Sequence, residues 1–198
     1  MKRALLVLAV ACSTPAEPQA DRFWAYFAAH ADQLRAEPLE TAMDQLQIAL
    51  EPAHHGVLAE LAADRDDRTL VLTADGDRAA FPDVEALYAK RPGVPHWTIR
   101  AFRQRDPARP LVPIASGSGA TLDPNAIRYV GDRANGKLDV ALFVPSYDQH
   151  EAKLVDIALD HVIGELDVAT KLGAISITTA DRVPAIAKPL VELANDVP

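Results

Sequence analysis

Arginines gather in one stretch of a chain that is otherwise acidic. The 198 residues carry a formal net charge of -8 at pH 7, yet five arginines lie between positions 91 and 109. Arg103 and Arg105 are two positions apart, so on a strand both side chains would lie on the same face. Because guanidinium groups bind anions by paired hydrogen bonds, this spacing predicts an anion site at Arg103 and Arg105. The alternative is a strand end in solvent whose arginines pair with surface carboxylates.

Histidines and carboxylates suggest a second chemistry, acid–base catalysis. An enzyme of this kind would need His96, Glu165 and Asp75 to be brought together by the fold. The segment 116–119, Ser-Gly-Ser-Gly, lacks the Gly-x-Ser-x-Gly pattern of a nucleophile, and no Gly-Lys-Ser/Thr follows it. We therefore assign no catalytic residue and interpret this segment as a connector.

Metal binding is a third hypothesis. His54 and His55 are adjacent, and His161 precedes Glu165 by four residues, which on a helix places both on one face. The sequence has no His-Glu-x-x-His motif and only one cysteine, and its acidic clusters at 64–67 and 75–77 lack calcium-loop spacing. We expect neither a metal nor another cofactor. The negative charge also argues against nucleic acid as a partner.

The N-terminus has the layout of an export signal. Lys2 and Arg3 precede an apolar run at 4–11, which ends at Cys12, the only cysteine. The run is eight residues long, whereas a membrane-spanning helix needs ~20. Residues 8–12, Leu-Ala-Val-Ala-Cys, resemble a bacterial lipobox, which implies lipidation of Cys12. We expect a signal peptide at 1–11, a tether at 12–20 and an anchor on the extracytoplasmic side of the cell envelope. The alternative is a cytoplasmic protein.

The rest of the chain, 21–198, is predicted to form a single α+β domain. Asp21 is a plausible N-cap for a first helix, whose apolar stripe is Phe23, Trp24, Phe27, Ala31 and Leu34. The charged residues 64–68 between two strand-like runs fit a hairpin, and Asn135-Gly136 is the strongest turn signal. Predicted helices start at Asp21 and cover 39–50, 81–88, 151–166 and 183–195, the last of them interrupted by Pro189. Predicted strands cover 57–63, 69–74, 96–105, 127–132, 137–145 and 174–179. Without regular strand–helix alternation, we expect one mainly antiparallel sheet of five to six strands, with helices on one face.

Three stretches resemble a family of uncharacterised bacterial proteins, a domain of unknown function. They are Phe-Trp-x-x-Phe at 23–27, Ala-Asp-Gly at 74–76 with Phe-Pro-x-Val-x-x-Leu at 81–87, and Trp-x-Ile-x-Ala-Phe-Arg-x-Arg at 97–105. Leu-x-x-x-Ile-Gly-Glu at 159–165 also fits. The resemblance implies common ancestry but no activity.

The aromatic residues in these stretches have a physical interpretation of their own. Trp24 and Phe27 lie one helical turn apart, and Trp97, Ile99 and Ala101 alternate on one strand face. We expect both sets to meet in the core, the alternative being an aromatic ligand wall. Taken together, the sequence favours a non-enzymatic binding or interaction module at the envelope. A hydrolase-like enzyme is the alternative.

Overall fold

The computed structural model describes residues 17–52, 56–64, 66–105, 107, 111–115, 119–145, 152–181 and 183–198. The predicted signal peptide, Cys12, His54, His55 and the segment 116–118 lie outside the described residues. The α+β class is confirmed, because helices and sheets both occur throughout the described chain. The expected single sheet of five to six strands is wrong. The described strands form three sheets, of three, two and four strands.

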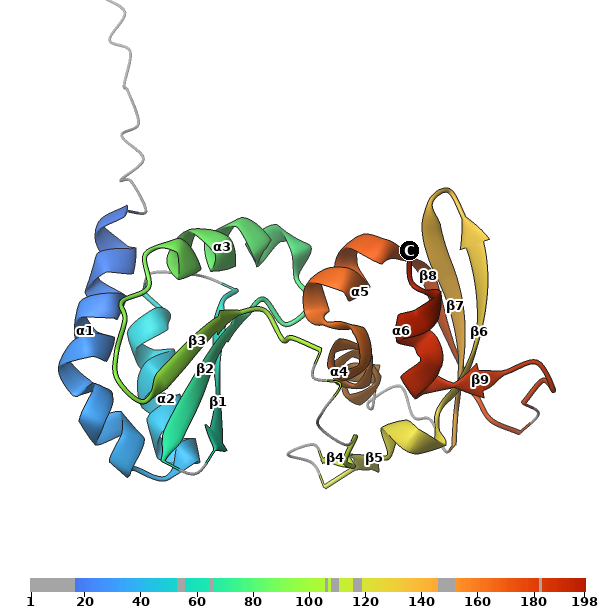
Figure 1. The fold of residues 1–198 in the computed structure, drawn as a ribbon, viewed down its shortest axis with the longest axis horizontal. Helices are drawn as coiled ribbons and strands as arrows, with labels where there is room; N and C mark the ends of the chain where they lie inside the picture. Colours follow the sequence, from blue (N-terminus) through green and yellow to red (C-terminus); the bar gives the residue numbers. More distant parts are fainter. Residues whose placement is uncertain are drawn as a thin grey trace, which may run out of the picture.

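The first half of the chain forms a three-stranded sheet with helices on one face (Figure 1). Its elements are α1 (Glu17–Ala36), α2 (Leu39–Leu50), β1 (Leu58–Asp64), β2 (Asp67–Thr73), α3 (Phe81–Ala89) and β3 (Trp97–Ala101). β1 and β2 form an antiparallel hairpin, and β3 pairs with β2 in parallel after the crossover through α3. The sheet order is β1-β2-β3, so β3 is an edge strand.

The aromatic residues of this half lie in its core, as predicted. The expected stripe of α1 is buried throughout: Phe23, Trp24, Phe27, Ala31 and Leu34. The Trp97 ring packs against Phe27 with centroids 4.9 Å apart, and the indole N–H of Trp24 donates to the carbonyl of Leu87 at 2.8 Å. The α1 helix begins at Glu17, four residues before the expected N-cap, so residues 17–20 of the predicted tether are helical.

The second half repeats the same strand connectivity. Its elements are β4 (Ile114–Ala115), β5 (Thr121–Leu122), β6 (Arg128–Ala134), β7 (Lys137–Val144), α4 (Ala152–Ile163), α5 (Glu165–Lys171), β8 (Leu172–Thr179), β9 (Lys188–Pro189) and α6 (Leu193–Asp196). The β6–β7 hairpin turns at Asn135-Gly136, both at positive φ, as the sequence predicts. β8 then pairs with β7 in parallel. Both halves therefore contain a hairpin, a helical crossover and a parallel third strand.

Each half has its own apolar core. One buried cluster runs from Ala20 to Phe102, and a second runs from Leu122 to Leu193. In the second core the alternate residues Leu138, Val140, Leu142 and Val144 of β7 pack against α4. Figure 1 shows the two larger sheets apart from each other, with α4 and α5 between them. No helix in the described ranges is long and apolar enough to cross a membrane.

Three predicted elements have different boundaries in the structure. The predicted strand 96–105 ends at Ala101, because Phe102 adopts a φ of 61°. The predicted helix 151–166 is interrupted by Gly164 at a φ of 93°, which separates α4 from α5. The predicted last helix is wrong before Pro189, where the chain forms β9, whereas a 3-10 helix (Leu190–Glu192) and α6 follow Pro189.

Candidate functional site

A network of charged side chains joins the two halves, and we call it the ionic seam. It consists of Glu60, Thr73, Asp75, Arg103, Lys153, Asp160 and Glu165. Glu165, at the first residue of α5, is 1% exposed, and within the described ranges its carboxylate accepts its hydrogen bonds from the first half. Its Oε2 accepts from Thr73 Oγ1 at 2.7 Å and from the Arg103 backbone N–H at 3.1 Å. Its Oε1 accepts from the backbone N–H groups of Ala74 at 3.0 Å and Gly76 at 3.4 Å.

The buried guanidinium of Arg103 is the cationic centre of the ionic seam. Its Nε lies 3.1 Å from both carboxylate oxygens of Glu60 on β1. Its two terminal nitrogens donate to Asp160 Oδ2 on α4 at 2.8 Å and to Asp75 Oδ1 at 2.7 Å. Lys153 adds a second cation, forming an ion pair with the Asp75 carboxylate and donating to the Asp75 carbonyl at 2.9 Å. The Arg103 guanidinium therefore donates its hydrogen bonds to carboxylates of the protein itself.

Three local backbone conformations bring these groups together. Asp75 and Gly76, with φ of 53° and 85°, form a type I′ turn closed by a 2.9 Å bond from Asp77 N to the Ala74 carbonyl. This turn presents the N–H groups of Ala74 and Gly76, which donate hydrogen bonds to the Glu165 carboxylate. Phe102 turns the chain after β3 and delivers Arg103 to the seam, although a bulky residue at positive φ costs ~1–2 kcal/mol. Its ring packs on Phe81 with centroids 4.7 Å apart.

Gly164 lies close to the backbone of Arg103 and Arg105. A Cβ at this position would lie 3.4 Å from the Arg105 backbone N and 3.5 Å from the Arg103 carbonyl. The Arg103 carbonyl accepts from the Glu165 N–H at 2.9 Å. The three sequence fragments Ala-Asp-Gly at 74–76, Phe-Arg at 102–103 and Gly-Glu at 164–165 therefore meet at one place, although they lie far apart in the chain.

The ionic seam contains more carboxylates than cations. Burial and hydrogen bonding shift the pKa values of its two aspartates in opposite directions. Burial raises the pKa of Asp160 to about 7, with Arg103 opposing the shift and the nearby charges of Glu165 and Asp156 adding to it. Burial also raises the pKa of Asp156. At Asp75 burial acts in the same direction, but hydrogen bonds from Lys153 and Arg103 outweigh it and lower the pKa. Burial therefore brings the pKa of Asp160 close to neutral pH.

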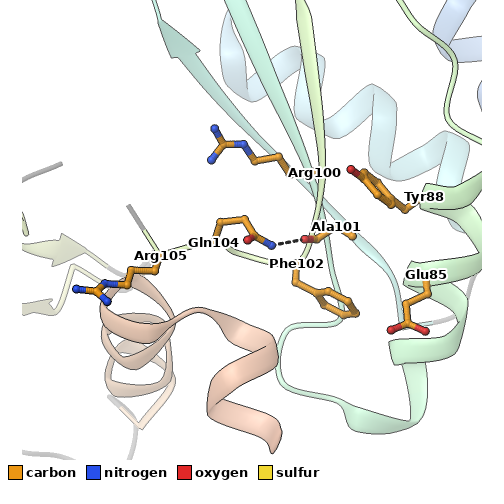
Figure 2. Close-up of a pocket in the computed structure, with 7 residues that line it drawn as sticks. All are labelled: Glu85, Tyr88, Arg100, Ala101, Phe102, Gln104 and Arg105. Carbon is orange, nitrogen blue, oxygen red and sulfur yellow. Dashed lines mark hydrogen bonds between the residues drawn. The ribbon is translucent and has the colours of Figure 1, made fainter. Parts of the chain in front are cut away.

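A depression of about 570 Å³ lies beside the free edge of β3 (Figure 2). It is lined by Glu85 and Tyr88 of α3 and by Arg100, Ala101, Phe102, Gln104 and Arg105. Arg100 and Arg105 are exposed. In Figure 2 both arginine side chains extend away from α3, which carries Glu85, the only acidic residue among the described residues of the lining. Gln104 Nε2 donates to the Ala101 carbonyl at 2.7 Å.

The predicted pair of arginines is divided between the two places. Arg103 and Arg105 do not share a strand face, because β3 ends at Ala101 and Phe102 turns the chain. Arg103 lies buried in the seam, whereas Arg105 is exposed and lines the depression with Arg100. The alternative interpretation, pairing with carboxylates, holds for Arg103, although its partners are buried or half-buried rather than at the open surface.

The predicted catalytic group is brought together only in part. Asp75 and Glu165 both belong to the ionic seam. His96 lies before β3, where its Nδ1 is 2.9 Å from Asp67 Oδ1. A strand of five residues separates it from the seam, which corresponds to ~17 Å. The described residues therefore do not place His96 beside Glu165.

The metal hypotheses find no cluster in the ranges that the structure covers. No group of three His, Cys, Asp or Glu side chains there has the geometry to hold a metal ion. His161 and Glu165 do not share a helix, because Gly164 separates α4 from α5.

Sequence reasoning missed Glu60, Thr73, Lys153 and Arg100. Glu60 had a usable signal, since it is a lone charge inside the apolar run 57–63 and a charge in such a run needs a buried partner. Lys153 and Thr73 had no comparable signal. Arg100 was passed over because two-residue alternation favoured Arg103 with Arg105.

No protein-family model, no curated protein and no solved structure matches this chain. The resemblance to a family of uncharacterised bacterial proteins stays a prediction.

Proposed function

We propose that this protein is a non-enzymatic binding module of the bacterial cell envelope, and that it takes an anionic partner at Arg100 and Arg105. The observation that carries the proposal is the depression beside β3, whose lining includes the exposed Arg100 and Arg105. Neither guanidinium group has a carboxylate partner among the described residues. Guanidinium groups of this kind bind carboxylate or phosphate by charge-assisted hydrogen bonds.

The net charge of the protein is opposite in sign to the charge of these two arginines. A net charge of -8 repels anions on average, so an anionic partner must be attracted by a local group. Arg91 lies nearby in sequence, with its guanidinium carbon 3.8 Å from the centre of the Tyr88 ring, which itself lines the depression. Glu85 is the one negatively charged residue in the described part of the lining.

The alternative function, a hydrolase-like enzyme, has less support. Glu165 is saturated by four donors, and Asp75 is bound to Arg103 and Lys153. A general base needs a free lone pair within reach of a substrate proton. Since these carboxylates are engaged in joining the two halves, a stabilising role explains them without catalysis.

Envelope anchoring through Cys12 is part of the proposal, and its support is the order of basic, apolar and cysteine residues at 2–12. Several acyl chains on Cys12 would give stable membrane attachment, at ~0.8 kcal/mol for each buried methylene. Cys12→Ser should move the protein from the membrane fraction of a bacterial host to the soluble fraction. Unchanged membrane association of the variant would contradict the lipid anchor.

Binding is tested with a fluorescein-labelled oligoglutamate and fluorescence anisotropy at low ionic strength. The wild type should bind, and the double variant Arg100→Glu/Arg105→Glu should lose at least about tenfold in affinity. The matched control is Arg22→Glu/Arg128→Glu, which makes the same charge change at exposed positions on α1 and β6. The proposal fails if the wild type does not bind, or if both double variants weaken binding equally.

A further inference from the structure

The free edge of β3 lies directly beside the depression. Among the described strands, β3 has a neighbour on one side only, since the sheet order is β1-β2-β3. The Arg68 N–H donates to the His96 carbonyl at 2.9 Å, and the Phe102 N–H donates to the Leu72 carbonyl at 2.7 Å. Because backbone direction alternates along a strand, Ile99 and Ala101 present their backbone groups to the opposite, open side.

Both ends of this open edge are closed by short-range hydrogen bonds. The Trp97 N–H donates to the Val94 carbonyl at 3.3 Å, and Gln104 covers the Ala101 carbonyl. Between these ends, the N–H and C=O of Ile99 and the N–H of Ala101 have no backbone partner in the described part of the chain. An exposed edge with unpaired groups is the template for an added strand.

The two faces beside the edge differ in chemistry. Arg100 is exposed on the face opposite the helices. Ile99 and Ala101 lie on the helix-covered face and pack against the first core, and Ala101 lines the depression with Tyr88 and Phe102. Side chains of an added strand would alternate between these faces. Acidic residues would then lie beside Arg100 and Arg105, and apolar residues would lie beside α3.

We propose that β3 binds an extended segment of a partner protein as an additional strand, and that the segment alternates acidic and apolar residues. This inference rests on the proposed function and narrows its anionic partner to a peptide chain. The hydrogen bonds to Ile99 and Ala101 hold the backbone, and the two arginines select the acidic positions.

The probe is the labelled peptide acetyl-Thr-Glu-Val-Glu-Val-Glu-Thr-amide, followed by anisotropy with the full chain. It should bind the wild type and lose at least about tenfold in affinity to Arg100→Glu/Arg105→Glu, but not to Arg22→Glu/Arg128→Glu. A peptide with lysine in place of glutamate should not bind. Absence of binding by the acidic peptide would overturn the inference. The oligoglutamate experiment tests the anionic site at Arg100 and Arg105 separately.

Two N-methylated peptides test the strand pairing itself. One carries N-methyl groups on both valines and the other on two of the glutamates, so that only one peptide loses amides that face β3. One of the two should bind about tenfold more weakly than the other: the valine peptide if pairing is antiparallel, the glutamate peptide if it is parallel. Amide exchange at Ile99 and Ala101 should also slow when the unmodified peptide is added. Equal affinities, or unchanged exchange at both residues, would overturn strand addition while leaving the anionic site intact.

Discussion

Replacing Glu165 with glutamine should destabilise the protein although the shape of the side chain hardly changes. The carboxylate accepts four hydrogen bonds, two on each oxygen. An amide keeps only one acceptor oxygen and places an NH₂ group against two of the donors. If the NH₂ faces the Ala74–Gly76 turn, both backbone N–H groups lose their acceptor. If it faces Thr73, the hydroxyl can turn, but the Arg103 N–H loses its acceptor.

The magnitude follows from the number of donors left without a partner. Each buried donor that loses its acceptor costs ~1–3 kcal/mol, so one or two such donors predict a loss of about 3 kcal/mol. Removing the negative charge of Glu165 offsets a small part of this loss, because that charge raises the pKa of Asp160. The variant should therefore keep its fold but unfold at clearly lower urea concentration.

The measurement is urea unfolding at pH 7 followed by far-ultraviolet circular dichroism. The matched control is Glu85→Gln, an exposed glutamate on α3, which should change the free energy of unfolding by less than ~0.5 kcal/mol. If Glu165→Gln is no more destabilising than this control, Glu165 does not hold the two halves together and the account of the ionic seam is wrong.

Three further predictions concern stability. Asp160→Asn should flatten the pH dependence of the free energy of unfolding. The pKa of Asp160 is about 7 in the folded protein and 3.8 ordinarily, so the wild-type residue binds a proton more tightly when folded. Its contribution to stability is therefore complete below about pH 4 and is lost as pH rises through 7. The difference in unfolding free energy between wild type and Asp160→Asn should therefore decrease from pH 5 to pH 8, and a constant difference would contradict this. Gly164→Ala should cost ~1–3 kcal/mol in urea unfolding because its φ is 93°, whereas Gly93→Ala, where a Cβ meets nothing within 4 Å, should be neutral. Trp24→Ala should cost ~3–5 kcal/mol as a buried aromatic residue, and more than Trp97→Ala, which is only partly buried; equal costs would argue against the difference in packing.

Local patterns predicted the elements whose formation depends on neighbouring residues. The apolar stripe of α1, the β1–β2 hairpin and the Asn135-Gly136 turn each follow from periodicity or from the residues that a turn requires. The strand order did not follow, because the parallel partners of β2 and β7 lie on the far side of a helical crossover. No periodicity distinguishes one sheet of six strands from the three smaller sheets of the structure.

The site was predictable where its residues were close in sequence. Arg105 was predicted, but the alternation rule failed at Phe102, where a bulky residue takes a conformation that its own preference disfavours. Asp75 and Glu165 were predicted together with His96, which lies at the other end of β3. Glu60 and Asp160 reach Arg103 only because two separate cores place their strands and helices around it.

The division of the apolar interior into two clusters has a consequence for cooperativity. Both tryptophans lie in the first half, so tryptophan fluorescence follows that half, whereas circular dichroism follows helices and strands in both. While the ionic seam is intact, the two signals should change at the same urea concentration. Once the seam is weakened, each half is left with the stability of its own small core, and the two transitions should separate.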